Sequence, residues 1–170
     1  MASIENVVRD RLQRDEIVAS MIVRMVRGVE IAAMAKGAGF HTIYVDLEHS
    51  SFSLDDATQI CVAALGQGLA PFVRVPAIDG ALIERLIDGG ALGIIVPHVE
   101  TADAARSVVD LVRYPPRGRR SAAGVLPHFQ YQAVPPAEMY ATVEAATMVI
   151  PMVESAAAVA APRTLLPSRA

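Results

Sequence analysis

Short apolar segments alternate with amphipathic segments along most of this sequence, and the alternation restricts the possible folds more than any other feature. The apolar segments carry few polar residues at alternate positions, which indicates strands that are buried on both faces. The segments between them have about 12 residues and the apolar period of a helix. Strands of this kind joined by helices predict an α/β fold with a parallel sheet.

The pattern divides into five strand–helix steps after a leading helix over residues 3–14. We expect strands over residues 17–25, 41–47, 70–76, 92–99 and 147–153. Ser53 and Thr101 are expected to cap two of the helices, because their hydroxyls can accept a helical N–H. No low-complexity linker interrupts the pattern, so residues 1–170 are expected to form a single domain. Residues 157–170 are an atypical tail, in which prolines oppose a long helix.

Composition excludes several classes of protein. The sequence is 53% hydrophobic and 19% charged, which excludes intrinsic disorder. No segment approaches the ~20 apolar residues of a membrane span. The formal net charge of −3 does not indicate a basic surface for nucleic-acid binding. Cys61 is the single cysteine, so neither an internal disulfide nor a cysteine metal cage can form. We expect a soluble cytoplasmic protein without membrane or nucleic-acid partners.

The basic residues exclude one kind of chemistry. Lys36 is the single lysine among 15 basic residues, and it lies late in an expected surface helix. A Schiff-base or pyridoxal-phosphate enzyme needs a lysine amine in a desolvated site. We therefore expect Lys36 to be solvated and the protein to use neither chemistry.

Polar residues at the carboxyl ends of the strands are the candidate reactive groups, because parallel β/α folds gather their sites there. Asp46 and His49 follow the second strand, where a turn could bring a carboxylate and an imidazole together for general-base work; a capping acid and a surface histidine are the alternative. Arg74 ends the third strand and could either hold a substrate carboxylate or make a structural ion pair.

The later strands end in two further candidates. His98 follows the fourth strand, where a packed histidine is favoured over a functional one. Glu154 follows the fifth strand and is either a ligand for a hard metal ion or a helix-capping carboxylate. His41 precedes the second strand and is interpreted as structural, whereas His128, in a long loop, has no assigned role.

Five segments in order give the chain a family resemblance: AGFHTIYVDLEHS, FVRVP, LIDGGALGIIVPHVET, RYPPRGRRS and IPMVES. With them the chain resembles the HpcH/HpaI aldolases, metal-dependent pyruvate aldolases, over residues 28 to 156. The resemblance implies a parallel (β/α) TIM-barrel type of fold, here a partial barrel of about five βα units with an N-terminal helix. A complete barrel typically has about 250 residues, and this chain has 170.

The resemblance also implies roles for individual residues. His49 matches a catalytic histidine in proton transfer, and Asp88 matches the acid that partners it across a subunit boundary. Arg74 matches the arginine that binds the pyruvyl carbonyl and stabilises the enolate. Asp46 matches an acid beside the site, and Arg120 matches a structural or interface arginine.

The family's metal site is only partly matched. Glu154 matches one of two carboxylate ligands of a divalent cation, Mg²⁺, Mn²⁺ or Co²⁺. The second carboxylate follows a sixth strand and is absent from this chain, which therefore looks C-terminally truncated. The resemblance further implies a homo-oligomer, a trimer or hexamer, that acts on a small 2-oxo acid.

Three functions follow as hypotheses. The first is a carbon–carbon lyase that cleaves a 4-hydroxy-2-oxo acid reversibly to pyruvate and an aldehyde, with a divalent metal. The second is an inactive truncated fragment or assembly module. The third is a citrate-synthase-like or decarboxylating condensing enzyme on the same scaffold.

Overall fold

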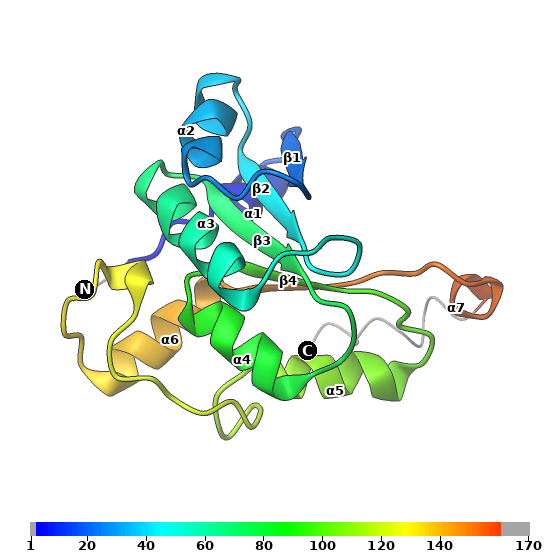
Figure 1. The fold of residues 1–170 in the computed structure, drawn as a ribbon. Helices are drawn as coiled ribbons and strands as arrows, with labels where there is room; N and C mark the ends of the chain where they lie inside the picture. Colours follow the sequence, from blue (N-terminus) through cyan, green and yellow to red (C-terminus); the bar gives the residue numbers. More distant parts are fainter. Residues whose placement is uncertain (1–2, 161–170) are drawn as a thin grey trace.

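The computed structural model describes residues 3–160, which form an α/β fold in the expected order (Figure 1). The strands are β1 (Ser20–Val23), β2 (Thr42–Asp46), β3 (Ala70–Arg74), β4 (Gly93–Val96) and β5 (Met148–Pro151). The helices are α1 (Val7–Gln13), α2 (Glu30–Gly37), α3 (Leu54–Gly66), α4 (Gly80–Asp88), α5 (Ala102–Val112), α6 (Pro136–Ala146) and α7 (Ala156–Ala160), with a 3₁₀ turn at Pro127–Phe129. Residues 161–170 of the predicted tail lie outside the described residues, and residues 157–160 belong to α7.

The sheet confirms the predicted parallel arrangement. Its strands pair in the order β1-β2-β3-β4-β5, and every pair is parallel. A doubly wound sheet reverses its strand order at a switch point, whereas a β/α barrel adds each strand beside the previous one. The observed order is that of consecutive barrel strands, which agrees with a partial barrel.

The two faces of the sheet bury different clusters. Helices α3 and α4 lie along one face (Figure 1), where they enclose the larger apolar cluster, with Val45, Val73 and Ile94 pointing toward them. Phe72 and Ile95 point to the other face and belong to a smaller cluster. Because side chains alternate along a strand, the residues that share this second face are the ones that can meet at its carboxyl end.

Helix α1 closes the amino end of the second face. Asn6 caps the helix by accepting the backbone N–H groups of Val8 and Arg9, each at 3.2 Å. Its amide donates to the carbonyls of Leu92 at 3.3 Å and Ala146 at 2.7 Å. The leading helix is thus fixed to the starts of β4 and β5, and the opposite end of the sheet is left for a site.

The predicted caps are confirmed, whereas the strands are shorter than predicted. Ser53 and Asp56 form a reciprocal capping box at α3, and the Thr101 hydroxyl accepts the N–H of Ala104 at α5. The expected strand over 92–99 ends at Val96, because Pro97 and the left-handed conformation of His98, with φ +56°, turn the chain away from the sheet.

His128 makes stability depend on pH. Burial lowers the pKa of His128 to about 4, and the charge of Arg120 adds to this effect. Above pH 6.5, the ordinary pKa of a histidine, the ring is neutral in the folded and in the unfolded chain. Below pH 6.5 the unfolded chain binds the proton first. We expect the free energy of unfolding to fall by about 3 kcal/mol from this group as pH drops from 6.5 to 4. Urea unfolding of His128→Gln should show a free energy of unfolding that falls less between pH 6.5 and pH 4. An unchanged fall would contradict a lowered pKa of His128 in the folded chain.

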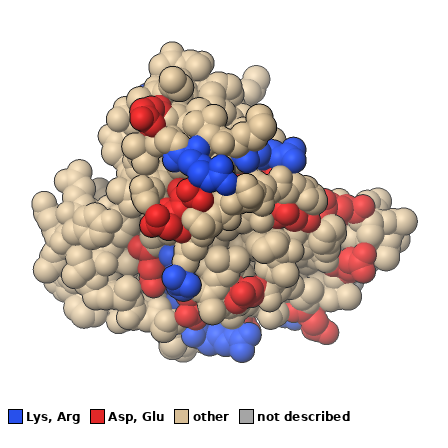
Figure 2. Space-filling view, viewed as in Figure 1, with Lys and Arg blue, Asp and Glu red and all other residues tan. Residues whose placement is uncertain are grey.

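The surface carries charges of both signs. On the face viewed in Figure 2, basic and acidic side chains lie beside one another in several places, and most of the area is neither. Within residues 3–160, none of the helices has the length and apolar character needed to span a bilayer.

Candidate active site

Asp46 and Arg74 meet at the carboxyl end of the sheet because the strand register places them opposite each other. They are the last residues of β2 and β3 and are direct partners in the parallel ladder. Arg74 Nε lies 2.9 Å from Asp46 Oδ1, and Arg74 Nη2 lies 2.7 Å from Oδ2, which makes a bidentate ion pair. The guanidinium also stands 5.6 Å from the ring centroid of Tyr44 on the same face.

Asp46 is fully buried but stays charged. Burial by itself raises the pKa of a carboxyl group, and the hydrogen bonds from Arg74 and from the backbone N–H groups of His49 and Glu48 outweigh it, so the pKa of Asp46 is lowered. Arg24 approaches the same carboxylate at 3.5 Å from the exposed side. The carboxylate therefore serves to hold Arg74 in place.

Glu48 is a site residue to which the sequence analysis gave no role. Its Oε2 lies 3.0 Å from Arg74 Nη1, and its Oε1 lies 3.0 Å from His98 Nε2. Its side chain is only 10% exposed. Glu48 lies in the turn that follows β2, where the strand period no longer indicates which way a side chain points, so only its nearness to the strand end could have suggested it.

His49 lies at the mouth of the site, with 61% of its side chain exposed. The sequence suggested that a turn could bring the His49 ring to the Asp46 carboxylate, but the two do not pair. Asp46 Oδ1 instead accepts the backbone N–H of His49 at 3.2 Å. The carboxylate nearest to the ring is Glu48, with Oε1 3.8 Å from Nε2. Arg24 fixes the backbone by donating to the His49 carbonyl at 3.1 Å.

The interpretation of His98 as a packed histidine is wrong. Its side chain is 70% exposed, and its left-handed backbone brings the ring over the strand ends to Glu48. The His98 backbone N–H donates to Glu154 Oε2 at 2.9 Å, and Nδ1 lies 3.6 Å from the same oxygen. Glu154, which follows β5, is thereby drawn to the group formed by β2, β3 and β4.

The fit of a divalent cation can be tested on these carboxylates. Glu154 Oε2 accepts the His98 backbone N–H, and the Glu48 carboxylate contacts Arg74 and His98. Among the described residues, no three His, Cys, Asp or Glu side chains gather closely enough to hold a metal ion. A hard cation needs about six oxygen ligands, so residues 3–160 do not form a complete metal site by themselves.

Asp88 lies apart from the other four predicted site residues. It is the last residue of α4, which runs back toward the amino end of the sheet, and it makes an ion pair with Arg120 at 2.6 Å. Arg120 is fully buried and stacks 4.6 Å from the centroid of Tyr114. Within one chain the structure does not bring Asp88 to His49.

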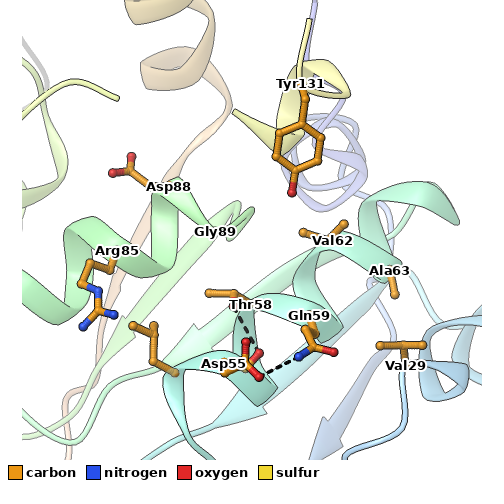
Figure 3. A pocket seen from close by; sticks show the side chains of 11 residues that line it. Val29, Asp55, Thr58, Gln59, Val62, Ala63, Arg85, Asp88, Gly89 and Tyr131 are labelled. Atoms are coloured by element: carbon orange, nitrogen blue, oxygen red, sulfur yellow. Dashed lines mark hydrogen bonds between the residues drawn. The ribbon is translucent and has the colours of Figure 1, made fainter. Parts of the chain in front are cut away.

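Asp88 borders a cavity of about 770 Å³ on the outer, helical side of the fold. Figure 3 shows Tyr131 beside Val62 of α3, with Arg85 and Asp88 of α4 on the other side of this cavity. The hydrogen bond from Gln59 to Asp55, 2.7 Å long, lies at its edge. None of the residues grouped around Arg74 lines it, so this cavity is distinct from the site at the strand ends.

Lys36 and the arginine-rich loop over residues 113–120 lie away from the site. Lys36 is exposed on α2, as expected for a solvated side chain. Arg113 donates to the carbonyls of Glu144 and Thr147, and Arg117 pairs with the Glu144 carboxylate at 3.4 Å. These contacts fix the loop to the end of α6.

Comparison with known proteins places this chain in one family. Residues 27–166 match the family model described as HpcH/HpaI aldolase/citrate lyase. A 4-hydroxy-4-methyl-2-oxoglutarate aldolase of Hapsidospora irregularis is 42% identical over 136 residues, which cover 79% of this chain and 50% of the relative. The chain belongs to the HpcH/HpaI aldolase/citrate lyase family.

Two further proteins are similar over nearly the whole chain. A second 4-hydroxy-4-methyl-2-oxoglutarate aldolase, from Chaetomium globosum, is 38% identical over 94% of this chain and 60% of its own length. The crystal structure of an HpcH/HpaI aldolase from Desulfitobacterium hafniense matches with a TM-score of 0.89 and 25% identity, over 95% of this chain and 62% of that one. The chain thus spans about half to two thirds of the length of these three proteins.

Proposed function

We propose that this chain carries the pyruvate-binding half of an aldolase that cleaves a 4-hydroxy-2-oxo acid to pyruvate and a carbonyl compound. The observation that supports this most is the fixed guanidinium of Arg74. An arginine has five N–H donors, and Asp46 takes two of them while Glu48 lies beside a third. Both terminal nitrogens therefore keep a donor for the oxygens of a 2-oxo acid.

The reaction needs a group of this kind. In the cleavage, the substrate's 4-hydroxyl loses its proton, the C3–C4 bond breaks, and its electron pair becomes the enolate of pyruvate, which then takes up a proton at C3. Negative charge develops on the carbonyl oxygen at C2, and an immobile cation there stabilises the transition state more than the ground state. We assign this role to Arg74.

We assign proton transfer to His49. Its ring is exposed at the mouth of the site, next to the Glu48 carboxylate, where it can contact a ligand that enters from solvent.

Two further assignments rest on the family resemblance. Glu154 would be one carboxylate ligand of a divalent cation, with the other ligands outside residues 3–160. Asp88 would act on His49 of another copy in a homo-oligomer of a cytoplasmic protein.

The test is pyruvate release from 4-hydroxy-2-oxo acids, among them 4-hydroxy-4-methyl-2-oxoglutarate, in the presence of Mg²⁺, Mn²⁺ or Co²⁺. Release that chelation abolishes supports the proposal. A folded chain that releases none under any of the three cations contradicts it and favours an inactive fragment. Consumption of oxaloacetate with acetyl-CoA, and not without it, would instead identify a condensing enzyme.

A further inference from the structure

Glu48 joins two residues that the strands do not bring into contact. Its side chain lies between Arg74 on β3 and His98 after β4, 3.0 Å from a nitrogen of each. Its own backbone N–H donates to Asp46 Oδ1 at 3.0 Å, so the turn after β2 holds it in place. One carboxylate therefore spans the carboxyl ends of three neighbouring strands.

The two contacts differ in geometry. Glu48 Oε1 and His98 Nε2 form a hydrogen bond. Glu48 Oε2 is buried and is close to Arg74 Nη1, but it has no aligned hydrogen-bond donor among the described residues. The contact with Arg74 is thus mainly electrostatic and restricts where the Nη1 end of the guanidinium can move.

Asp46 contacts only one edge of Arg74. Its two oxygens bind Nε and Nη2 and set the plane of the rigid guanidinium, and Glu48 adds a second, separate contact at Nη1. The His98 side chain is 70% exposed, and without Glu48 its ring would keep only the longer approach of Nδ1 to Glu154 Oε2, at 3.6 Å. Preorganisation of a binding group lowers the entropy lost when a ligand binds.

We propose that Glu48 is a positioning residue that fixes Arg74 Nη1 and the His98 ring together for the substrate. This inference builds on the proposed function, because it assigns Arg74 to the oxygens of a 2-oxo acid. A carboxylate so close to Arg74 also repels an anionic ligand. Replacing Glu48 by an uncharged residue would therefore tighten pyruvate binding if repulsion dominated and weaken it if positioning dominates.

The experiment uses the full 170-residue chain and the variant Glu48→Gln. Calorimetry measures the pyruvate affinity, and NMR measures the exchange of the Arg74 guanidinium protons with water. We expect Glu48→Gln to weaken pyruvate binding about tenfold and to speed Nη1 proton exchange by a similar factor, as for one lost charge-assisted contact. Glu48→Asp, which keeps the charge, should recover part of both effects.

Glu144→Gln is the matched control. Glu144 is 12% exposed and pairs with Arg117 at the other end of the fold, so this variant should change neither quantity. Tighter binding or unchanged Nη1 exchange in Glu48→Gln would overturn the inference. If the unsubstituted chain binds no pyruvate, the proposed function fails, and the Arg74 proton exchange still decides whether Glu48 fixes the guanidinium.

Discussion

Replacing Arg74 by methionine is expected to lower the free energy of unfolding by about 3–5 kcal/mol, because it leaves the buried carboxylate of Asp46 without its bidentate partner. The same variant should reduce pyruvate release by about 10²- to 10³-fold, the loss typical of a missing group that stabilises an oxyanion. Urea unfolding at pH 7 and a coupled pyruvate assay measure the two effects.

The effect on stability should depend on pH in a defined direction. In the unsubstituted chain, the pKa of Asp46 is lowered in the folded state, so its contribution to stability is present at neutral pH and is lost as pH falls through that pKa. In Arg74→Met, the buried carboxylate of Asp46 has lost its bidentate partner, and protonation removes the uncompensated charge. The difference between the two proteins should therefore shrink below about pH 4.

Arg24→Met is the control for this prediction. Arg24 approaches the same carboxylate at 3.5 Å, but its side chain is 55% exposed, and an exposed ion pair contributes only about 0–1 kcal/mol. A loss of stability in Arg74→Met no larger than in Arg24→Met would show that Asp46 does not depend on the bidentate pair.

His49→Ala is expected to remove activity without removing stability. The ring is exposed and is not part of either apolar cluster, so the free energy of unfolding should change by no more than about 0.5 kcal/mol. Pyruvate release should fall by about 10²- to 10⁴-fold, the usual contribution of a general acid–base group.

His41→Asn provides the comparison. His41 Nδ1 accepts the N–H of Ala19 at 3.0 Å at the amino end of the sheet, far from the strand ends that form the site. This variant should keep its activity under conditions in which it is folded. Equal activity of His49→Ala and the unsubstituted chain would exclude His49 from proton transfer.

Much of the fold could be predicted because its local and global signals agree. The strands lack polar alternation, and Ser53 and Thr101 cap α3 and α5 as predicted. Asn6 and Asp79 cap α1 and α4 in the same way. The strand ends were less predictable, since hydrophobicity continues past Val96 while the backbone turns at Pro97 and His98. Periodicity reports burial and does not report where a ladder ends.

The site was predictable in part for the same reason. The position of Arg74 and Asp46 at the ends of adjacent parallel strands follows from the strand–helix pattern, and their pairing follows from the register. The roles of Glu48 and His98 depend on two turns whose conformations no sequence period encodes. Asp88 illustrates a different limit, because the role proposed for it lies between two copies, and the contacts of one chain do not test that role.

Whether Arg74 stabilises the enolate of pyruvate is tested most directly by the exchange of the pyruvate methyl protons with deuterium, followed by NMR in D₂O with a divalent cation present. This exchange needs only the enolate, so it does not depend on which carbonyl compound the proposed cleavage releases. We expect exchange faster than in buffer with the same cation, and its loss in Arg74→Met. Exchange no faster than in that buffer, from the folded unsubstituted chain, would contradict this role of Arg74.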